Sequence, residues 1–218
     1  MGLLDRLAPR RPEPEIRPPV DLPADEPLFA TKALRKLISA LTGRESPSLI
    51  DLGPVVGTNV SFFGEQMGCK IFIEDIYTEL ERHARSGKLE EFPAFLSRRF
   101  SQPDGSIDGI ICWDLIDYLD KASAQVLADQ LTRVLRPEGA LLAFFGNALP
   151  REATYTKFVI ADDTNLKYRT SPATRGRQAV LLNRDIIRLF TGLRVSDSFL
   201  MKNNIREILF RKPSYETR

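Results

Sequence analysis

The fold of this chain is decided by residues 48–57, which read Ser48-Leu49-Ile50-Asp51-Leu52-Gly53-Pro54-Val55-Val56-Gly57. The apolar run at the start predicts a buried strand. Gly53 and Gly57 predict a turn with close backbone approach, because neither residue has a Cβ atom. From Val60 onward apolar residues return at helical spacing, with Thr58 or Asn59 as the expected N-cap. A strand, a turn and a helix in this order present backbone N–H groups to a ligand.

Length and composition predict a single soluble domain. The chain has 218 residues, of which 43% are hydrophobic and 28% are charged, so it is long enough to bury a full core. The chain contains no run of about 18 apolar residues, so no membrane span is predicted. The chain has 2 cysteines and lacks the apolar segment of a signal peptide, so we expect a cytoplasmic protein without a disulfide framework.

The same strand-then-helix pattern recurs along the chain. Further strands are expected at residues 69–73, 107–113 and 140–145, and further helices at 28–41, 77–87, 122–135 and 183–190. Strands that alternate with helices predict an α/β fold with a doubly wound, mostly parallel sheet. Two late strands, at 195–201 and 205–210, predict a closing antiparallel hairpin.

The ends of the domain differ from this pattern. Residues 1–27 hold 7 of the 15 prolines and predict a disordered, Pro-rich tail. The domain is then expected over residues 28–218, with an inserted hairpin at about 155–169 whose turn contains Asp162 and Asn165.

Acidic residues follow three of the expected strands: Asp51, the pair Glu74 and Asp75, and Asp114. Ligands of open α/β sheets bind at the carboxyl ends of strands, so these acids are expected to meet in one crevice. Each alone would also serve as a helix cap. Asp75 follows Asp51 by 24 residues, close to the spacing at which an acid takes ribose hydroxyls in nucleotide-binding folds.

The glycine loop excludes two common nucleotide motifs. Val55 and Thr58 stand where a dinucleotide fingerprint requires glycine, so NAD is disfavoured. No Gly-Lys-Ser/Thr follows, so the loop is not a P-loop.

Four stretches together resemble the class I S-adenosylmethionine-dependent methyltransferases. They are similar to the glycine-loop motif, the second acidic motif, the fourth-strand region and the hinge before the fifth strand, and lie at residues 51–57, 73–75, 104–114 and 135–142. The resemblance runs from about Leu28 to Pro213 and implies a Rossmann-like, seven-stranded sheet with a transferase activity.

The resemblance implies S-adenosylmethionine as cofactor. The cofactor-binding residues it implies are Asp51, Gly53, Val55, Gly57, Asn59, Glu74, Asp75, Ile76 and Asp114. The glycine loop and the Thr58-Asn59 helix start would hold the methionine part, Glu74 or Asp75 the ribose, and Ile76 or a neighbour the adenine. Asp114 would lie near the methyl donor and is the nearest catalytic candidate. No metal site is expected, and the methyl acceptor, a small molecule or a macromolecule, is not identified.

Two alternatives remain open. Val55 replaces the family's central loop glycine and Leu96–Arg99 replaces an adenine-binding acid, which favours a non-catalytic, methyltransferase-like binding or scaffold protein. Residues 169–218 carry 11 Lys or Arg against 4 Asp or Glu, which favours a nucleic-acid-associated protein. Residues 169–177 form a basic loop, either a lid over the crevice or an ordinary surface loop.

Overall fold

The computed structural model describes residues 26–214, so most of the tail expected over residues 1–27 lies outside the described residues. The helices are α1 (Ala33–Leu41), α2 (Gly57–Val60) continued by the π-helical η1 (Ser61–Gln66), α3 (Ile76–Arg85), η2 (Leu89–Glu91), α4 (Phe92–Arg99), η3 (Leu115–Tyr118), α5 (Lys121–Val134) and α6 (Asn183–Leu189). The strands are β1 (Leu28–Ala30), β2 (Ser48–Asp51), β3 (Lys70–Ile73), β4 (Ile107–Trp113), β5 (Leu135–Gly146), β6 (Thr154–Ile160), β7 (Asn165–Pro172), β8 (Arg194–Leu200) and β9 (Ile205–Arg211).

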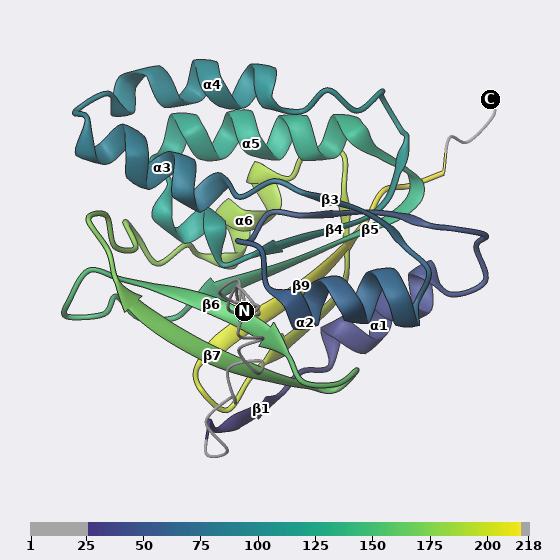
Figure 1. Cartoon of the computed structure of the whole chain (residues 1–218). Helices are drawn as coiled ribbons and strands as arrows, with labels where there is room; N and C mark the ends of the chain where they lie inside the picture. The colour runs from purple at the N-terminus through teal and green to yellow at the C-terminus, as the bar shows by residue number, and fades with distance from the viewer. Residues whose placement is uncertain (1–25, 215–218) are drawn as a thin grey trace, which may run out of the picture.

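The central sheet has the strand order β3-β2-β4-β5-β9-β8 (Figure 1). Its first four strands are parallel, and β9 runs antiparallel to both neighbours. The expected doubly wound, mostly parallel sheet with a closing antiparallel hairpin is therefore confirmed.

The central sheet has six strands in the described part of the chain, whereas seven were expected. No strand forms between α4 and β4, where residues 100–106 are irregular. There the guanidinium of Arg133 donates to the carbonyls of Phe100 and Gln102, at 2.9 and 3.0 Å. A side chain thus satisfies backbone acceptors that would otherwise need a neighbouring strand.

Helices cover both faces of the sheet, as Figure 1 shows: α3, α4 and α5 lie over one face, and α1 and α2 over the other. Alternate residues of β5 enter the two cores, since Leu141 and Phe145 pack with the α3–α5 side and Leu142 and Phe144 with the α1 side. This burial on both faces explains why the β5 sequence is almost continuously apolar.

A second, smaller sheet has the order β1-β7-β6. The β6–β7 hairpin covers residues 154–172 and turns at Asp162, whose carboxylate accepts from Thr164 and Asn165. Residues 28–30 were expected as the start of the helix that ends at residue 41, and this is wrong: they form β1, which pairs with β7, and α1 begins at Ala33. This small sheet packs against the carboxyl ends of β2 and β4, where the candidate site lies.

One buried carboxylate joins the two ends of the domain. Glu207 of β9 accepts from the Thr31 hydroxyl at 2.5 Å and from the backbone N–H groups of Lys32 and Ala33 at 3.1 and 2.9 Å. Two of the N–H groups that α1 cannot bond internally are thereby satisfied from the last strand of the sheet.

We therefore expect Glu207→Ala to lower the free energy of unfolding by about 3 kcal/mol, because it leaves two buried donors and one part-buried donor without an acceptor. Chemical denaturation measures this loss, with exposed Glu65→Ala as the control, expected within about 0.5 kcal/mol of wild type. Equal stability of the two variants would contradict this role of Glu207.

Candidate functional site

The glycine loop connects β2 to α2 as expected, but its helix is capped differently. Val56 is the N-cap residue of α2, and no side chain caps this helix. The expectation that Thr58 or Asn59 caps the helix is therefore wrong. Val55 is 71% exposed, so most of its side chain faces solvent. Gly57 faces open space, since a Cβ added there would meet no atom within 4 Å.

Asn59 is buried and attaches α2 to the hairpin. Its amide nitrogen donates to the Phe158 carbonyl at 3.0 Å, and its amide oxygen accepts from the Ile160 N–H at 2.8 Å. The amide of Asn59 thus bonds the β6 backbone as a neighbouring strand would, and it holds β6 against the glycine loop. The role of Asn59 towards a cofactor stays a prediction.

Asp51 ends β2 in a buried position beneath Trp113. Its carboxylate accepts from the indole N–H at 2.6 Å and from the Gly53 N–H at 2.9 Å. Burial raises the pKa of Asp51 to about 6, although both hydrogen bonds lower it. A Cβ added to Gly53 would lie 2.7 Å from the indole nitrogen, so glycine is required at this position.

The two acids after β3 have different surroundings. Glu74 forms an ion pair with Arg99 at 2.7 Å, so the segment in which an adenine-binding acid was expected supplies a cation to Glu74 instead. Asp75 caps α3 by accepting from the Thr78 N–H at 3.1 Å and makes no ion pair with any described residue. Ile76, expected against the adenine, is fully buried in the core under α3.

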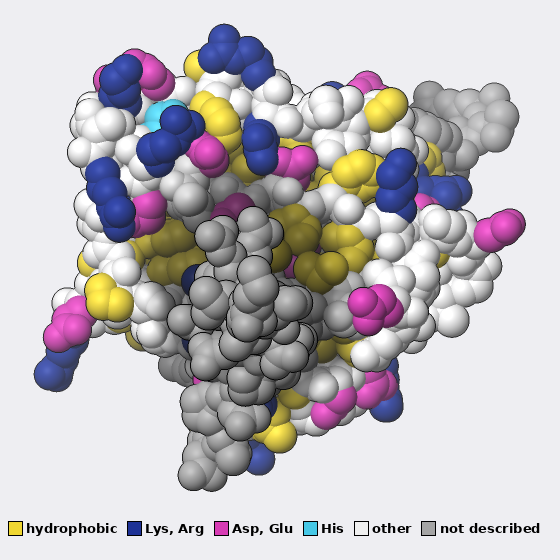
Figure 2. Space-filling model, viewed as in Figure 1, with side chains coloured by type: hydrophobic (Ala, Val, Ile, Leu, Met, Phe, Trp, Pro, Cys, Tyr) yellow, Lys and Arg dark blue, Asp and Glu magenta, His cyan; other side chains and the backbone are white. Residues whose placement is uncertain are grey.

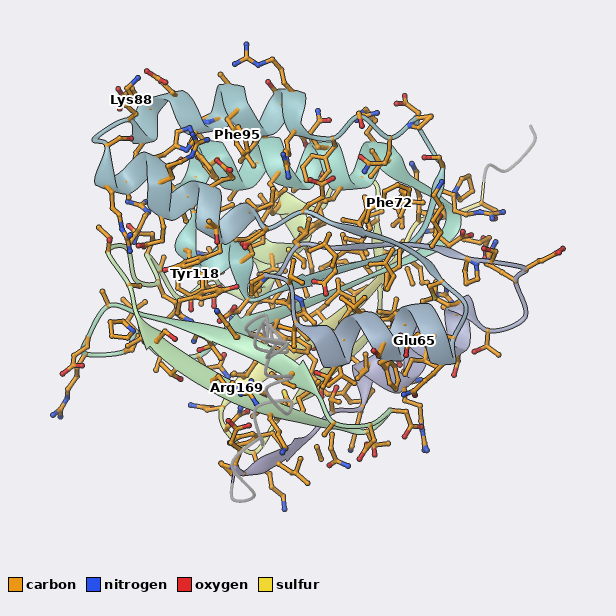
Figure 3. All side chains as sticks on the ribbon, viewed as in Figure 1. Glu65, Phe72, Lys88, Phe95, Tyr118 and Arg169 are labelled. Carbon is orange, nitrogen blue, oxygen red and sulfur yellow. The ribbon has the colours of Figure 1, made fainter. Side chains whose placement is uncertain are left out.

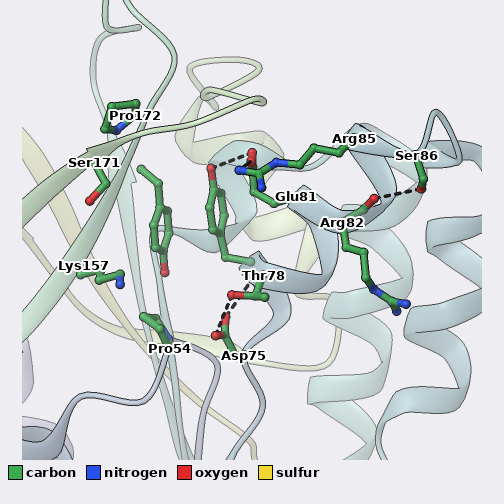
Figure 4. A pocket seen from close by; sticks show the side chains of 12 residues that line it. Pro54, Asp75, Thr78, Glu81, Arg82, Arg85, Ser86, Lys157, Ser171 and Pro172 are labelled. Carbon is green, nitrogen blue, oxygen red and sulfur yellow. Dashed lines mark hydrogen bonds and ion pairs between the residues drawn. The ribbon is translucent and has the colours of Figure 1, made fainter.

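A groove of about 620 Å³ runs along α3 towards the hairpin (Figure 4). Asp75 and Pro54 of the glycine loop both line it, and Lys157 and Ser171 of the hairpin form its other wall. Arg82 of α3 also lines the groove, and Figure 2 shows basic side chains over the region of α3 and α4. The structure thus brings the glycine loop and one of the two candidate ribose acids to one groove.

Asp114 does not face this groove with a free carboxylate. It is buried and pairs with the Arg177 guanidinium at 2.7 Å, and the Tyr118 hydroxyl donates to it at 3.2 Å. Burial raises the pKa of Asp114, whereas the Arg177 charge lowers it. Asp117, one helical turn further, is a member of this cluster that the sequence analysis missed. Its position three residues after Asp114 was the available signal.

The basic loop expected as a lid or surface loop is attached to the domain. The Thr174 and Arg175 N–H groups both donate to the Glu81 carboxylate at 2.9 Å, and the Arg175 guanidinium donates to the Tyr118 carbonyl at 3.0 Å. Burial alone would raise the pKa of Glu81, but these backbone hydrogen bonds hold it below its usual range. The segment therefore lies against α3 as a fixed strap.

Aromatic side chains fill the space between α3 and β6. Tyr77 and Tyr155 stack with ring centroids 3.5 Å apart, and Tyr118 meets Tyr77 edge-on at 5.1 Å. Tyr118 lies between α3 and the hairpin in Figure 3. Burial raises the pKa of each of these tyrosines above its usual range, so all three stay neutral. No sequence motif indicated this cluster, because its members come from three separate elements.

Several basic residues of the C-terminal part are engaged within the domain. Arg169 pairs with Glu26 at 2.9 Å, and Arg206 donates to Asn183 at 2.6 Å. Nucleic-acid binding stays a prediction.

Residues 26–214 show no disulfide, no membrane-spanning helix and no cluster of metal-binding side chains. Cys69 and Cys112 are free and buried. Within residues 26–214, no helix has the length and apolar character needed to cross a membrane, and no group of His, Cys, Asp and Glu side chains could hold a metal ion.

Comparisons with known proteins give structural likenesses only. No family profile and no curated protein sequence matches the chain. Among solved structures, the PH0226 protein from Pyrococcus horikoshii is 18% identical, covers 84% of this chain and 92% of its own, and has a TM-score of 0.49. A TehB-like S-adenosylmethionine-dependent methyltransferase from Corynebacterium glutamicum is 17% identical, with 82% and 86% covered and a TM-score of 0.49.

A third solved structure is a 1,6-didemethyltoxoflavin-N1-methyltransferase from Burkholderia thailandensis, crystallised with S-adenosylhomocysteine. It is 14% identical, with 84% and 78% covered and a TM-score of 0.48.

The raised pKa of the buried Asp117 carboxyl predicts that the free energy of unfolding depends on pH. Burial raises its pKa to about 7, whereas an unfolded Asp releases its proton near the ordinary value of 3.8. The folded state then binds more protons between these values, so the free energy of unfolding falls as pH rises from about 4 to 7. Asp117→Asn removes this ionisation and is expected to raise the free energy of unfolding at pH 8 by up to about 4 kcal/mol.

Denaturation at a series of pH values measures this difference. The control is exposed Asp129→Asn on α5, which should keep the wild-type profile. An unchanged slope between pH 6 and 7 in Asp117→Asn would refute the assignment.

Proposed function

We propose that this protein is an S-adenosylmethionine-dependent methyltransferase with an unidentified acceptor. The observation that supports this proposal best is that Asp75 and the glycine loop line the same groove of about 620 Å³ at the carboxyl edge of the sheet. A pocket of this size is in the range that holds a small-molecule ligand. A glycine loop and an acid beside one groove fit a nucleoside whose ribose hydroxyls donate to a carboxylate.

The chain's own donors and acceptors suit this cofactor. Asp75 keeps a carboxylate without an ion pair to any described residue, and Gly57 leaves open space beside the loop backbone. Gly53 also lacks a Cβ, but the Trp113 indole covers it, so a ligand reaches this part of the loop only after the indole moves. Asp75 is our choice for the ribose, because Glu74 is already paired with Arg99.

When bound, the cofactor supplies a methyl group on a positively charged sulfur. The residues of this chain would then act mainly by orientation, which methyl transfer needs more than acid or base catalysis. Asp114, the nearest catalytic candidate, is buried, paired with Arg177 and absent from the lining of the groove, so it is not placed to take a proton there. We propose for it a role in fixing the loop that follows β4, not in proton transfer.

A non-catalytic binding protein with the same fold is the second candidate. One observation favours it: the crevice at the ends of β2 and β4 is filled by buried aromatic side chains, among them Trp113, Tyr118, Tyr155 and Phe158. A protein that no longer binds cofactor would keep such a crevice closed.

We also propose a cytoplasmic location, since two free cysteines suit a reducing compartment.

Titration calorimetry with S-adenosylhomocysteine separates the two candidates. We expect binding to the wild-type protein, and a loss of affinity of about tenfold or more in Asp75→Asn, because an amide accepts ribose hydroxyls less strongly than a carboxylate does. Asp120→Asn is the matched control, since Asp120 caps α5 as Asp75 caps α3. Absence of any heat at millimolar ligand would sink the enzyme proposal and leave the binding protein.

A further inference from the structure

Trp113 is the residue whose position the fold explains least. It ends β4 with a φ of 50°, in the left-handed region that a bulky side chain rarely adopts. It is also the single tryptophan of the chain and is 4% exposed. A backbone held this way persists only where surrounding contacts fix it, and such positions cluster at ligand sites and switch regions.

Contacts on two sides fix the indole. On one side, its N–H donates to the buried Asp51 carboxylate at 2.6 Å, directly over Gly53. On the other side, its ring stacks on Phe158 of the hairpin, with centroids 5.2 Å apart and planes 3° from parallel. The indole is therefore clamped between the glycine loop and β6.

The hairpin side of this clamp is itself attached to the loop. Asn59 of α2 bonds the backbone of β6 on both sides of Val159, at Phe158 and Ile160. Movement of the indole away from Gly53 thus requires either a new rotamer within the clamp or displacement of β6.

We propose that Trp113 is the gate residue of the cofactor site. In the arrangement that the structure shows, its indole covers Gly53 and donates to Asp51. The indole would withdraw when the cofactor reaches the glycine loop. This inference rests on the proposed function. Because only molecules with the indole withdrawn can bind, the apparent affinity is lowered by the fraction of closed molecules.

The single tryptophan provides a direct test on the unmodified protein. Titration with S-adenosylhomocysteine should shift the fluorescence emission of Trp113 to longer wavelength, because the ring leaves a buried stack for a more polar environment. The midpoint should equal the dissociation constant from calorimetry on the same sample.

A substitution tests the same gate by affinity. Trp113→Phe keeps a ring that can stack on Phe158 but lacks the N–H that holds Asp51, so the closed state is weakened. We expect S-adenosylhomocysteine to bind about tenfold more tightly by calorimetry, the effect of losing one hydrogen bond to a charged group. Phe190→Leu is the matched control, since Phe190 is a buried aromatic packed on Phe210, away from the loop, and should leave the affinity unchanged.

The outcomes separate the gate from the function. The gate would be overturned, while the function stands, if the wild type binds with an unshifted emission and Trp113→Phe binds equally or more weakly. Binding by Trp113→Phe alone would support a gate that stays closed in the wild type. Absence of binding by both proteins would overturn the proposed function and the gate together.

Discussion

The carboxylate of Asp51 is buried at the end of β2, and the arrangement of the candidate site depends on how it is satisfied. A buried carboxylate without partners is costly, so the fold must supply donors at this point. It supplies the Gly53 N–H from the loop and the indole N–H of Trp113 from the adjacent strand. These two hydrogen bonds fix the turn of the loop, the left-handed backbone at the end of β4, and through Phe158 the position of the hairpin.

The same requirement organises the rest of the carboxyl edge. Asp114 and Asp117 share Arg177, and Glu74 takes Arg99. Glu81 accepts two backbone N–H groups of the strap. Buried carboxylates are kept because each has a partner from a distant part of the chain, and the strap and hairpin are held against the sheet by these pairs. Asp75 is the exception, since it contacts only its own helix and faces the groove.

Much of the fold could be predicted from periodicity. The strand at 48–51, the almost unbroken apolar run of β5 and the closing hairpin all follow from local patterns, because burial on one or both faces dictates which residues repeat. The absence of the seventh strand could not be predicted, since the backbone of residues 100 and 102 is bonded by Arg133 of α5, a contact that no local pattern shows. The cap of α2 was also missed, because Asn59 bonds a strand that lies about 100 residues further along the chain.

Of the candidate site, the sequence by itself determined which residue types stand at the strand ends: a glycine loop after β2 and acids after β2, β3 and β4. Local spacing suffices for this, because parallel strands place their carboxyl ends along one edge of the sheet. Only the tertiary structure decided which of these groups remain free for a ligand. Trp113 and Arg177 reach their carboxylate partners from 62 and 63 residues away. Phe158 of β6 stacks on Trp113, and these contacts depend on packing that no local pattern encodes.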